Sequence, residues 1–210
     1  MEIFAPYLGT LLDYGSYQNL DTEELKNMAP GVNLDFGSSP RMVDSEEYLR
    51  VFNRIIERRK DGYCGLGIGS FLNLSSLGLV LEISLNTSSI EQGVMILQNF
   101  LDSKFPIVGA SVIKNSEHYI IQLDSPVQNP DTKKQLLDMV LCIVYRELKL
   151  MLADAFQPRV RLPFSDRIPY LRAFDDHVTY HSKYQIVLPL EITKAEINGN
   201  KMKEIEMILP

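Results

Sequence analysis

His177 and His181 are the residues whose spacing most directly suggests a metal site. On a helix, histidines four residues apart lie on one face, and Asp175 and Asp176 are close by in the sequence. The segment has the pattern of a strand and a turn, however, in which the second side chain lies along the chain and not beside the first. No cysteine or further histidine joins the two, so no metal site is predicted.

Nucleophilic catalysis and phosphate binding both lack their usual residues. The chain has no G-x-S-x-G motif, and Cys142 lies in an apolar helical pattern that disfavours a thiolate. Cys64 and Cys142 are both expected to be buried and reduced. Gly65, Gly67 and Gly69 look like part of a phosphate loop but lack the Lys-Ser/Thr of a P-loop. Close helix packing or a tight turn is the favoured interpretation, and neither a catalytic residue nor a cofactor is predicted.

Glu82 is the most informative single residue, because it interrupts the apolar run LGLVLEISL. A buried carboxylate is costly unless it pairs, reaches water or faces a cavity. Exposure at the helix margin is one interpretation. The other is that Glu82 faces a ligand cavity and meets a cationic or hydroxyl group there. Four further candidates for this cavity carry a polar tip on a mainly apolar element, with core packing as the alternative for each: Tyr119, Tyr145, Arg161 and Tyr184.

Composition indicates one globular domain over residues 1–210. The chain is 45% hydrophobic, enough for a sizeable core, and its formal net charge of -6 argues against direct contact with a nucleic-acid backbone. No apolar run approaches the ~20 residues that span a bilayer. The N-terminus also lacks the basic and apolar regions of a signal peptide, so we expect a cytoplasmic protein with no membrane partner.

Helix signals dominate the first half of the chain. Asp21 and Asp44 are expected to cap two helices, the second with an apolar inner face from Tyr48 to Ile56. Leu77–Leu85 is apolar on nearly all sides and predicts a buried helix. Ser88-Ser89-Ile90-Glu91 then has the S-x-x-E form of a capping box, with Ser88 as the cap of an amphipathic helix that reaches Leu101.

The longest predicted helix runs from about Thr132 to Asp154, with Asp131 as its cap. Its wide apolar face indicates that it lies across a sheet. The remaining narrow strip of the helix is expected to be polar and carries Asp138, Arg146 and Lys149.

Strand signals dominate the second half. Ile107–Ile113 and His118–Leu123 flank a polar turn and predict an antiparallel hairpin. Pro158–Phe164 reads as a strand bounded by prolines, and Ile168–Phe174 suits a short helix. Val178–Tyr180 and Gln185–Leu188 flank a turn and predict a second hairpin. The expected fold is therefore α+β, with a helical N-terminal half packed on a small, mainly antiparallel sheet of about five strands that carries the long central helix.

The order of these pieces resembles the ligand-sensing N-terminal domain, often labelled arabinose-binding, of a subset of AraC-type bacterial transcription regulators. In that family a D-x-x-L-G-L-x-x-G run precedes L-G, an apolar helix, an S-P-T-L cap and a long helix. In this chain Asp61–Gly67 corresponds to the D-x-x-L-G-L-x-x-G run. The S-P-T-L cap corresponds to Thr87-Ser88-Ser89-Ile90. The resemblance runs from about Leu20 to Leu190.

The second half carries the resemblance further. The family's V-R-F strand, short helix ending in Phe, and P-V-x-F hairpin correspond to Val160-Arg161-Leu162, Phe174 and Val178-Thr179-Tyr180. Phe164 stands where the family often has His, and Tyr184 where it often has Asn. A polar contact made in relatives is therefore not expected in this chain.

The resemblance implies an effector-sensing and dimerisation domain that performs no chemistry. Its expected partners are a small-molecule effector and a second copy of the chain. DNA would be contacted only through a C-terminal helix-turn-helix domain beyond residue 210. Two alternatives remain from other classes of protein: an enzyme that processes a small hydrophobic molecule, and an interaction module without a pocket.

Overall fold

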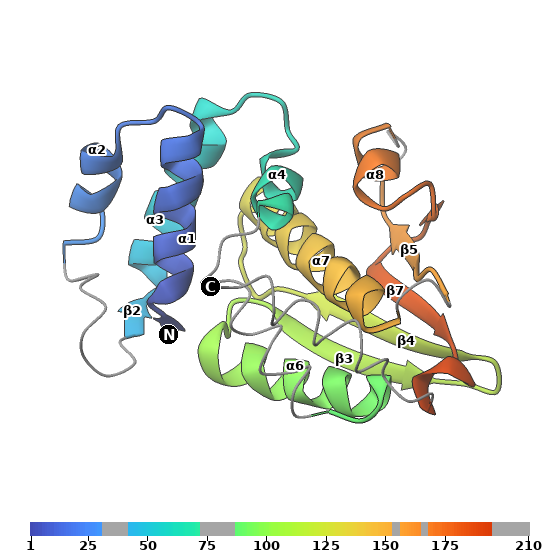
Figure 1. Cartoon of the computed structure of the whole chain (residues 1–210). Helices are drawn as coiled ribbons and strands as arrows, with labels where there is room; N and C mark the ends of the chain where they lie inside the picture. Colours follow the sequence, from blue (N-terminus) through green and yellow to red (C-terminus); the bar gives the residue numbers. More distant parts are fainter. Residues whose placement is uncertain (31–41, 72–86, 153–155, 165–167, 195–210) are drawn as a thin grey trace, which may run out of the picture.

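A five-stranded sheet and the long helix across it form the centre of the molecule (Figure 1). The computed structural model describes residues 1–30, 42–71, 87–152, 156–164 and 168–194. The sheet order is β3-β4-β7-β5-β6, and every neighbouring pair is antiparallel except β5 and β6. The strands are β3 (Gly109–Lys114), β4 (His118–Asp124), β5 (Arg159–Leu162), β6 (Val178–Tyr180) and β7 (Tyr184–Pro189). This arrangement confirms the predicted α+β class and the first hairpin.

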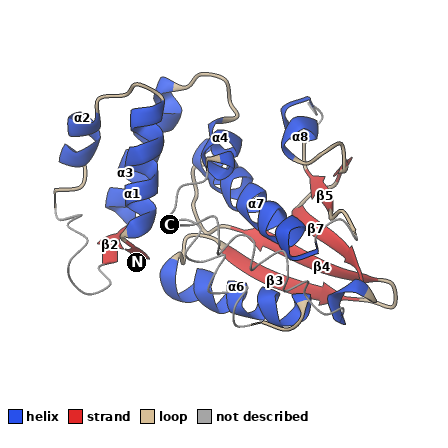
Figure 2. Cartoon of the chain, in the orientation of Figure 1, coloured by secondary structure: helices blue, strands red, loops and turns tan. Residues whose placement is uncertain are grey.

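Helices lie on and beside this sheet (Figure 2). The long helix α7 (Pro130–Leu152) crosses β4 and β7, and α6 (Ile90–Lys104) packs against β3. The N-terminal helices α1, α2 and α3 form a group beside them, and α4 lies on α7 (Figure 1). The remaining bounds are α1 (Pro6–Tyr17), α2 (Thr22–Asn27), α3 (Ser45–Arg58), α4 (Cys64–Ser70), α8 (Ile168–Ala173) and η1 (Ile192–Lys194), and a two-stranded sheet joins β1 (Glu2–Phe4) to β2 (Met42–Asp44).

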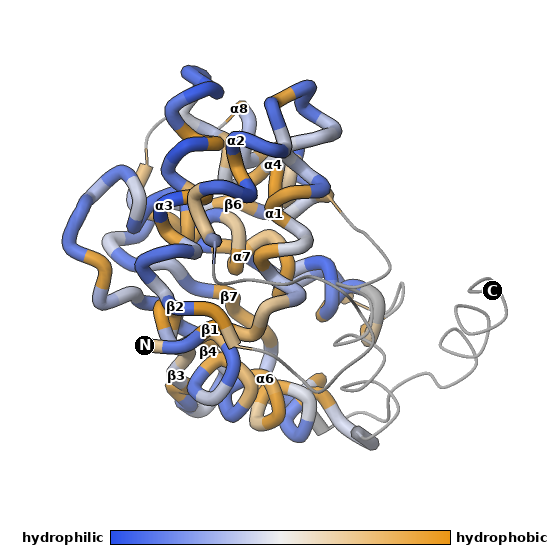
Figure 3. The backbone as a smooth tube through the Cα atoms, turned by 90° about the vertical axis from the view of Figure 1, so that its left-hand side faces the viewer, coloured by the Kyte–Doolittle hydropathy of each residue, from blue (hydrophilic) through white to orange (hydrophobic). Residues whose placement is uncertain are grey.

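Helix starts follow the sequence signals closely. Asp21 accepts hydrogen bonds from the amides of Glu23 and Glu24, and Asp44 accepts one from Glu46, so both predicted caps are confirmed. The inner face of α3 is buried from Tyr48 to Ile56, also as predicted. Figure 3 shows hydrophobic and hydrophilic residues alternating around α6, as expected of an amphipathic helix.

Two other caps lie one or two residues from the predicted positions. Ser89, and not Ser88, caps α6 by accepting the Gln92 amide, while the Gln92 side chain accepts from the Ser88 amide. Gln92 thus takes the role predicted for Glu91, because the box is shifted by one residue. Asn129, and not Asp131, caps α7, since its side chain accepts from the amides of Asp131 and Thr132.

The predicted second hairpin is wrong. β6 and β7 are separated in the sheet by β5, which pairs in parallel with β6 and antiparallel with β7. The three residues between β6 and β7 look like a hairpin turn in sequence, but β5 satisfies the inner backbone groups of both strands. Helix α8 connects β5 to β6 and makes this parallel pairing possible.

Helices α4 and α7 touch backbone to backbone at two glycines. A Cβ on Gly65 would lie 2.1 Å from the Gln135 carbonyl oxygen, and one on Gly69 would lie 2.5 Å from that of Met139. The Gly65 amide also donates to the Gln135 side chain at 2.7 Å. These contacts confirm the packing interpretation of the glycines.

Gly65→Ala is therefore expected to destabilise the protein by at least about 2 kcal/mol, because the new methyl group meets backbone that cannot rotate away. Gly9→Ala in α1 is the matched control, since nothing lies within 4 Å of its Cβ position. That change should leave stability unchanged or raise it by up to about 1 kcal/mol. Urea denaturation of both variants measures the difference, and equal midpoints would contradict the close contact.

Candidate functional site

Helix α7 buries two carboxylic acids on opposite faces. Asp138 is fully buried and Glu147 is 7% exposed. They are nine positions apart in the sequence, which at about 3.6 residues per turn places them half a turn apart around the helix. Asp138 faces α8 and the turn before α4, whereas Glu147 faces α6. The predicted polar strip of α7 is thus wrong at Asp138, while Arg146 and Lys149 are half-buried.

Asp138 is compensated by hydrogen bonds. Its Oδ2 accepts from the Lys134 ammonium at 2.9 Å and from the Tyr170 hydroxyl at 3.0 Å. Burial raises the pKa of Asp138 to about 6, although Lys134 and Tyr170 both act to lower it. Its Oδ1 has no partner among the described residues. The group is therefore stabilised on one oxygen only.

Aromatic rings enclose the Lys134 ammonium. The rings of Tyr63 and Phe164 are each 5.1 Å from it, and that of Tyr170 is 5.7 Å away. The ammonium also donates to the Gly62 carbonyl at 2.7 Å. Cation–π contacts of this kind are most favourable when they are shielded from water. This cage satisfies Lys134 internally, so it serves as a structural joint between α7, α8 and the turn before α4.

Tyr184 belongs to the same neighbourhood. Its ring meets Phe164 edge-on with centroids 5.9 Å apart, and its buried hydroxyl has no described partner. Burial first, and the nearby Asp138 charge second, raise the pKa of Tyr184. We call Tyr63, Lys134, Asp138, Phe164, Tyr170 and Tyr184 the Asp138 cluster.

An open cleft of about 380 Å³ lies next to this cluster and shares Tyr63 with it. Its volume is within the roughly 300 to 1,000 Å³ of small-molecule sites. Three parts of the chain line it: the segment after α3, one side of α4, and α8. The lining residues are Arg59, Asp61, Tyr63, Leu66, Gly67, Ser70, Pro169, Arg172 and Ala173.

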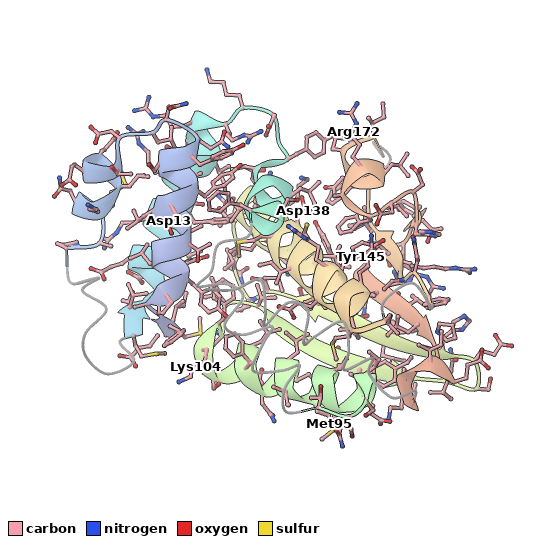
Figure 4. The ribbon with its side chains drawn as sticks, viewed as in Figure 1. Asp13, Met95, Lys104, Asp138, Tyr145 and Arg172 are labelled. Atoms are coloured by element: carbon pink, nitrogen blue, oxygen red, sulfur yellow. The ribbon has the colours of Figure 1, made fainter. Side chains whose placement is uncertain are left out.

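The cleft has charged side chains at two ends: Arg59 and Asp61, which are held by hydrogen bonds, and Arg172, which pairs with no described acid. The Arg59 guanidinium donates to the Tyr14 hydroxyl at 2.8 Å, to Gln18 at 3.2 Å and to Asp61. Burial alone would raise the pKa of Asp61, but the Tyr63 amide and Arg59 hold it below its ordinary value. Arg172 lies on α8 at the outer surface (Figure 4), and no described acid pairs with it.

Glu147 has no such compensation. It lines a cavity of about 10 Å³ between α6 and α7, room for one water-sized group. The other walls are Gly93, Val94, Leu97, Val144, Leu148 and Met151. Among the described residues nothing donates a hydrogen bond to Glu147 or forms an ion pair with it, and burial raises its pKa to about 8. Burial raises the pKa of the Tyr7 hydroxyl on α1, and the charge of Glu147 is the second cause that raises it.

Of the five residues predicted to contact a ligand, the four that the structure describes do not converge on either hollow. Tyr184 joins the Asp138 cluster, and Tyr145 donates to the Phe174 carbonyl and to Asp175, both at 3.1 Å, at the end of α8. Tyr119 is buried under the Lys114 ammonium, and Arg161 is half-buried in β5. None of these four lines the cleft or the α6–α7 cavity. Glu82 lies outside the described residues, and ligand contact by all five stays a prediction.

Sequence reasoning missed the two buried acids, although their positions carried a signal. Glu147 lies three residues after Val144 and four before Met151, which places it on the apolar face of α7. Asp138 lies three before Leu141 and seven before Tyr145, on another buried side. In a helix buried on most sides, a narrow polar strip is a poor guide to exposure.

Membrane insertion and metal binding have no support in the described residues. No described helix combines the length and the apolar character that crossing a bilayer requires. Within the same residues, no three His, Cys, Asp or Glu side chains gather closely enough to hold a metal ion.

Asp138→Ala is expected to lower the free energy of unfolding by about 2–4 kcal/mol, because it leaves the buried Tyr170 hydroxyl without an acceptor and the Lys134 ammonium without its carboxylate. Asp131→Ala is the control on the same helix, since Asp131 is exposed. Urea unfolding at pH 7 distinguishes the two. Similar losses in both variants would show that the cluster does not stabilise the fold.

Glu147→Gln is expected to stabilise the protein at neutral and alkaline pH. The folded-state pKa is raised from 4.5 to about 8, so the folded protein holds this proton more tightly and the wild type loses stability as pH rises through that window. The variant should gain on the order of 2–4 kcal/mol over the wild type at pH 8 and little at pH 4. Thermal unfolding against pH measures the gain, with exposed Glu117→Gln as control. A gain independent of pH would contradict the buried acid.

Comparison with solved structures finds the same fold in a bacterial regulator. The crystal structure of the transcriptional regulator CdpR from Pseudomonas aeruginosa superposes with a TM-score of 0.67 at 17% sequence identity. The match covers 92% of this chain and 57% of that chain. No curated protein sequence matches this chain significantly.

Comparison with protein families finds a match that runs from residue 29 to residue 194. It begins just after α2, ends at η1, and includes the elements that build both hollows. The family is one of sensor domains of transcription regulators and not of enzymes. This chain belongs to the family described as the arabinose-binding domain of AraC transcription regulators, the N-terminal part of those proteins.

Proposed function

We propose that this chain is the effector-sensing and dimerisation domain of an AraC-type transcription regulator, and that a small molecule binds in the cleft between α4 and α8. The observation that carries the proposal is the metabolite-sized cleft of about 380 Å³ in a chain of this family. A pocketless interaction module would not need such a cleft. DNA would be bound by a helix-turn-helix domain attached after residue 210.

The position of the cleft supports a signalling role. Its walls belong to three bodies: the end of the N-terminal helical group at Arg59 and Asp61, α4, and α8 at Pro169 and Arg172. Helix α4 is fixed to α7 by its glycines, whereas α8 reaches the same helix through side chains such as Tyr170. A ligand that touches all three would favour one spacing of α8 from the N-terminal group.

Such a ligand acts by differential affinity. A molecule that binds one arrangement more tightly shifts the population towards it by that difference in free energy, and the shift is then available to an attached domain or a second subunit. Homodimerisation is proposed on the family resemblance. Cleft polarity also suits recognition, since Arg59 and Asp61 are held in place at one end, and at the other end Arg172 pairs with no acid among the described residues.

A metabolite screen by thermal shift tests the proposal. A true effector should raise the melting temperature, because a ligand at about 100 times its Kd adds roughly 2.7 kcal/mol to stability. Ala173→Trp places a large side chain in the cleft wall and should abolish the shift. Asn99→Trp, at an exposed position of α6, should keep it.

Two outcomes would count against the proposal. A compound that stabilises wild type and Ala173→Trp equally would place the effector elsewhere. A regulator carrying this domain whose DNA binding responds to no metabolite would remove the sensing role.

A further inference from the structure

We propose that the α6–α7 cavity is a second ligand site, which receives the primary ammonium group of a small amine against the Glu147 carboxylate. The inference does not depend on the cleft between α4 and α8, because the two hollows share no residue. It starts from a contrast within one helix. Asp138 is buried with an ammonium and a hydroxyl bound to it, and Glu147 is buried with neither.

Because no described residue pairs with the buried Glu147 carboxyl, we look for its partner outside the described part of the chain, in a bound ligand. A carboxyl in an apolar cavity costs several kcal/mol unless it is paired or hydrogen-bonded. A leucine or methionine at this position of α7 would remove that cost and continue the apolar face formed by Val144 and Met151. Groups kept in such surroundings are concentrated at functional sites.

The negative charge of the Glu147 carboxylate favours a positively charged ligand. In surroundings of low dielectric constant a carboxylate gains most from a positive charge at hydrogen-bond distance, and a charged hydrogen bond is roughly twice as strong as a neutral one. The described walls other than Glu147 are apolar or glycine, so they offer no competing polar group. An anion would meet no donor there.

The volume of the cavity further limits which cationic groups can bind. The cavity holds about 10 Å³, enough for one water molecule or one ammonium group. A guanidinium or a quaternary ammonium group is too large to enter without separation of α6 from α7. The ligand is therefore a primary amine whose ammonium group alone fills the cavity, and its carbon chain extends outward through the open side.

Binding of an ammonium group at Glu147 would also affect helix α1. The Tyr7 hydroxyl is electrostatically coupled to Glu147. The Tyr7 ring packs on Phe100 of α6 with centroids 5.8 Å apart and on Phe105 with centroids 5.2 Å apart. Tyr48 of α3 meets Phe105 in turn at 5.3 Å. One ring cluster thus joins α6, which forms one wall of the Glu147 cavity, to the N-terminal helices α1 and α3.

Calorimetric titration with n-butylamine tests the inference, with n-butanol, butyrate and tetramethylammonium as probes of equal or similar size. Only n-butylamine should bind, with a Kd on the order of 1 mM for so small a probe. At pH 7 close to one proton should be released per amine bound, because the pKa of Glu147 is about 8 and the bound ammonium favours the carboxylate. Titrations in two buffers of different ionisation enthalpy measure that proton.

Two variants separate charge from space. Glu147→Gln should weaken n-butylamine binding at least tenfold and remove the proton release, while Glu117→Gln, on the exposed turn before β4, should change neither. Gly93→Ala keeps the carboxyl but adds a methyl group to the cavity wall, so it should also abolish binding while the pH dependence of stability remains.

Several results would overturn the inference. They are equal binding of n-butanol or tetramethylammonium, unchanged affinity in Glu147→Gln, and no binding of n-butylamine at about 50 mM, far above the expected Kd. Failure of n-butylamine to bind, together with an effector whose binding depends on Ala173, would overturn this inference and leave the proposed sensor role intact. Loss of that effector's binding in Ala173→Trp with retained n-butylamine binding would show two independent sites.

Discussion

The backbone contact between α4 and α7 is the constraint on which the described architecture depends. Gly65 and Gly69 let the two helices approach to a separation that any side chain would prevent. The turn before α4 is held to the same helix, because the Gly62 carbonyl accepts from both Lys134 and Gln135. One wall of the cleft is therefore a fixed extension of α7, and the opposite wall, on α8, is connected to α7 only through side chains.

Helix α7 organises the molecule because it is buried on nearly all sides. Towards the sheet and α6 it packs apolar residues. Towards α8 it packs the Asp138 cluster, in which an acid and a lysine pair with each other among four aromatic rings. Towards α6 it also carries Glu147, whose burial has no compensation among the described residues. The same helix thus uses one buried acid as a structural joint and keeps the other available. Stability and binding are separated on opposite faces of one element.

Elements with strong local signals were predictable. The caps at Asp21 and Asp44, the buried face of α3 and the hairpin of β3 and β4 depend on neighbours in sequence, and all are confirmed. Where two neighbouring residues could both cap a helix, the predicted cap was the wrong one of the two. Ser89 caps α6 in place of Ser88, and Asn129 caps α7 in place of Asp131. The second hairpin failed for another reason. The partner of a strand is chosen by the whole sheet, and β5, distant in sequence from β7, satisfies the backbone groups that a tight turn alone would have joined.

The sequence by itself determined the fold class, because periodicity and composition are local properties of the chain, and the order of its motifs indicated the family by resemblance. Only the tertiary structure decided which acids are buried and which of them are paired. Exposure of Asp138 and Glu147 is set by α8 and α6, which contact opposite sides of α7 and come from distant parts of the chain. The cleft also depends on the tertiary structure. Its two sides, the segment after α3 and helix α8, are separated by about half of the sequence, and the packing of α4 on α7 makes them neighbours.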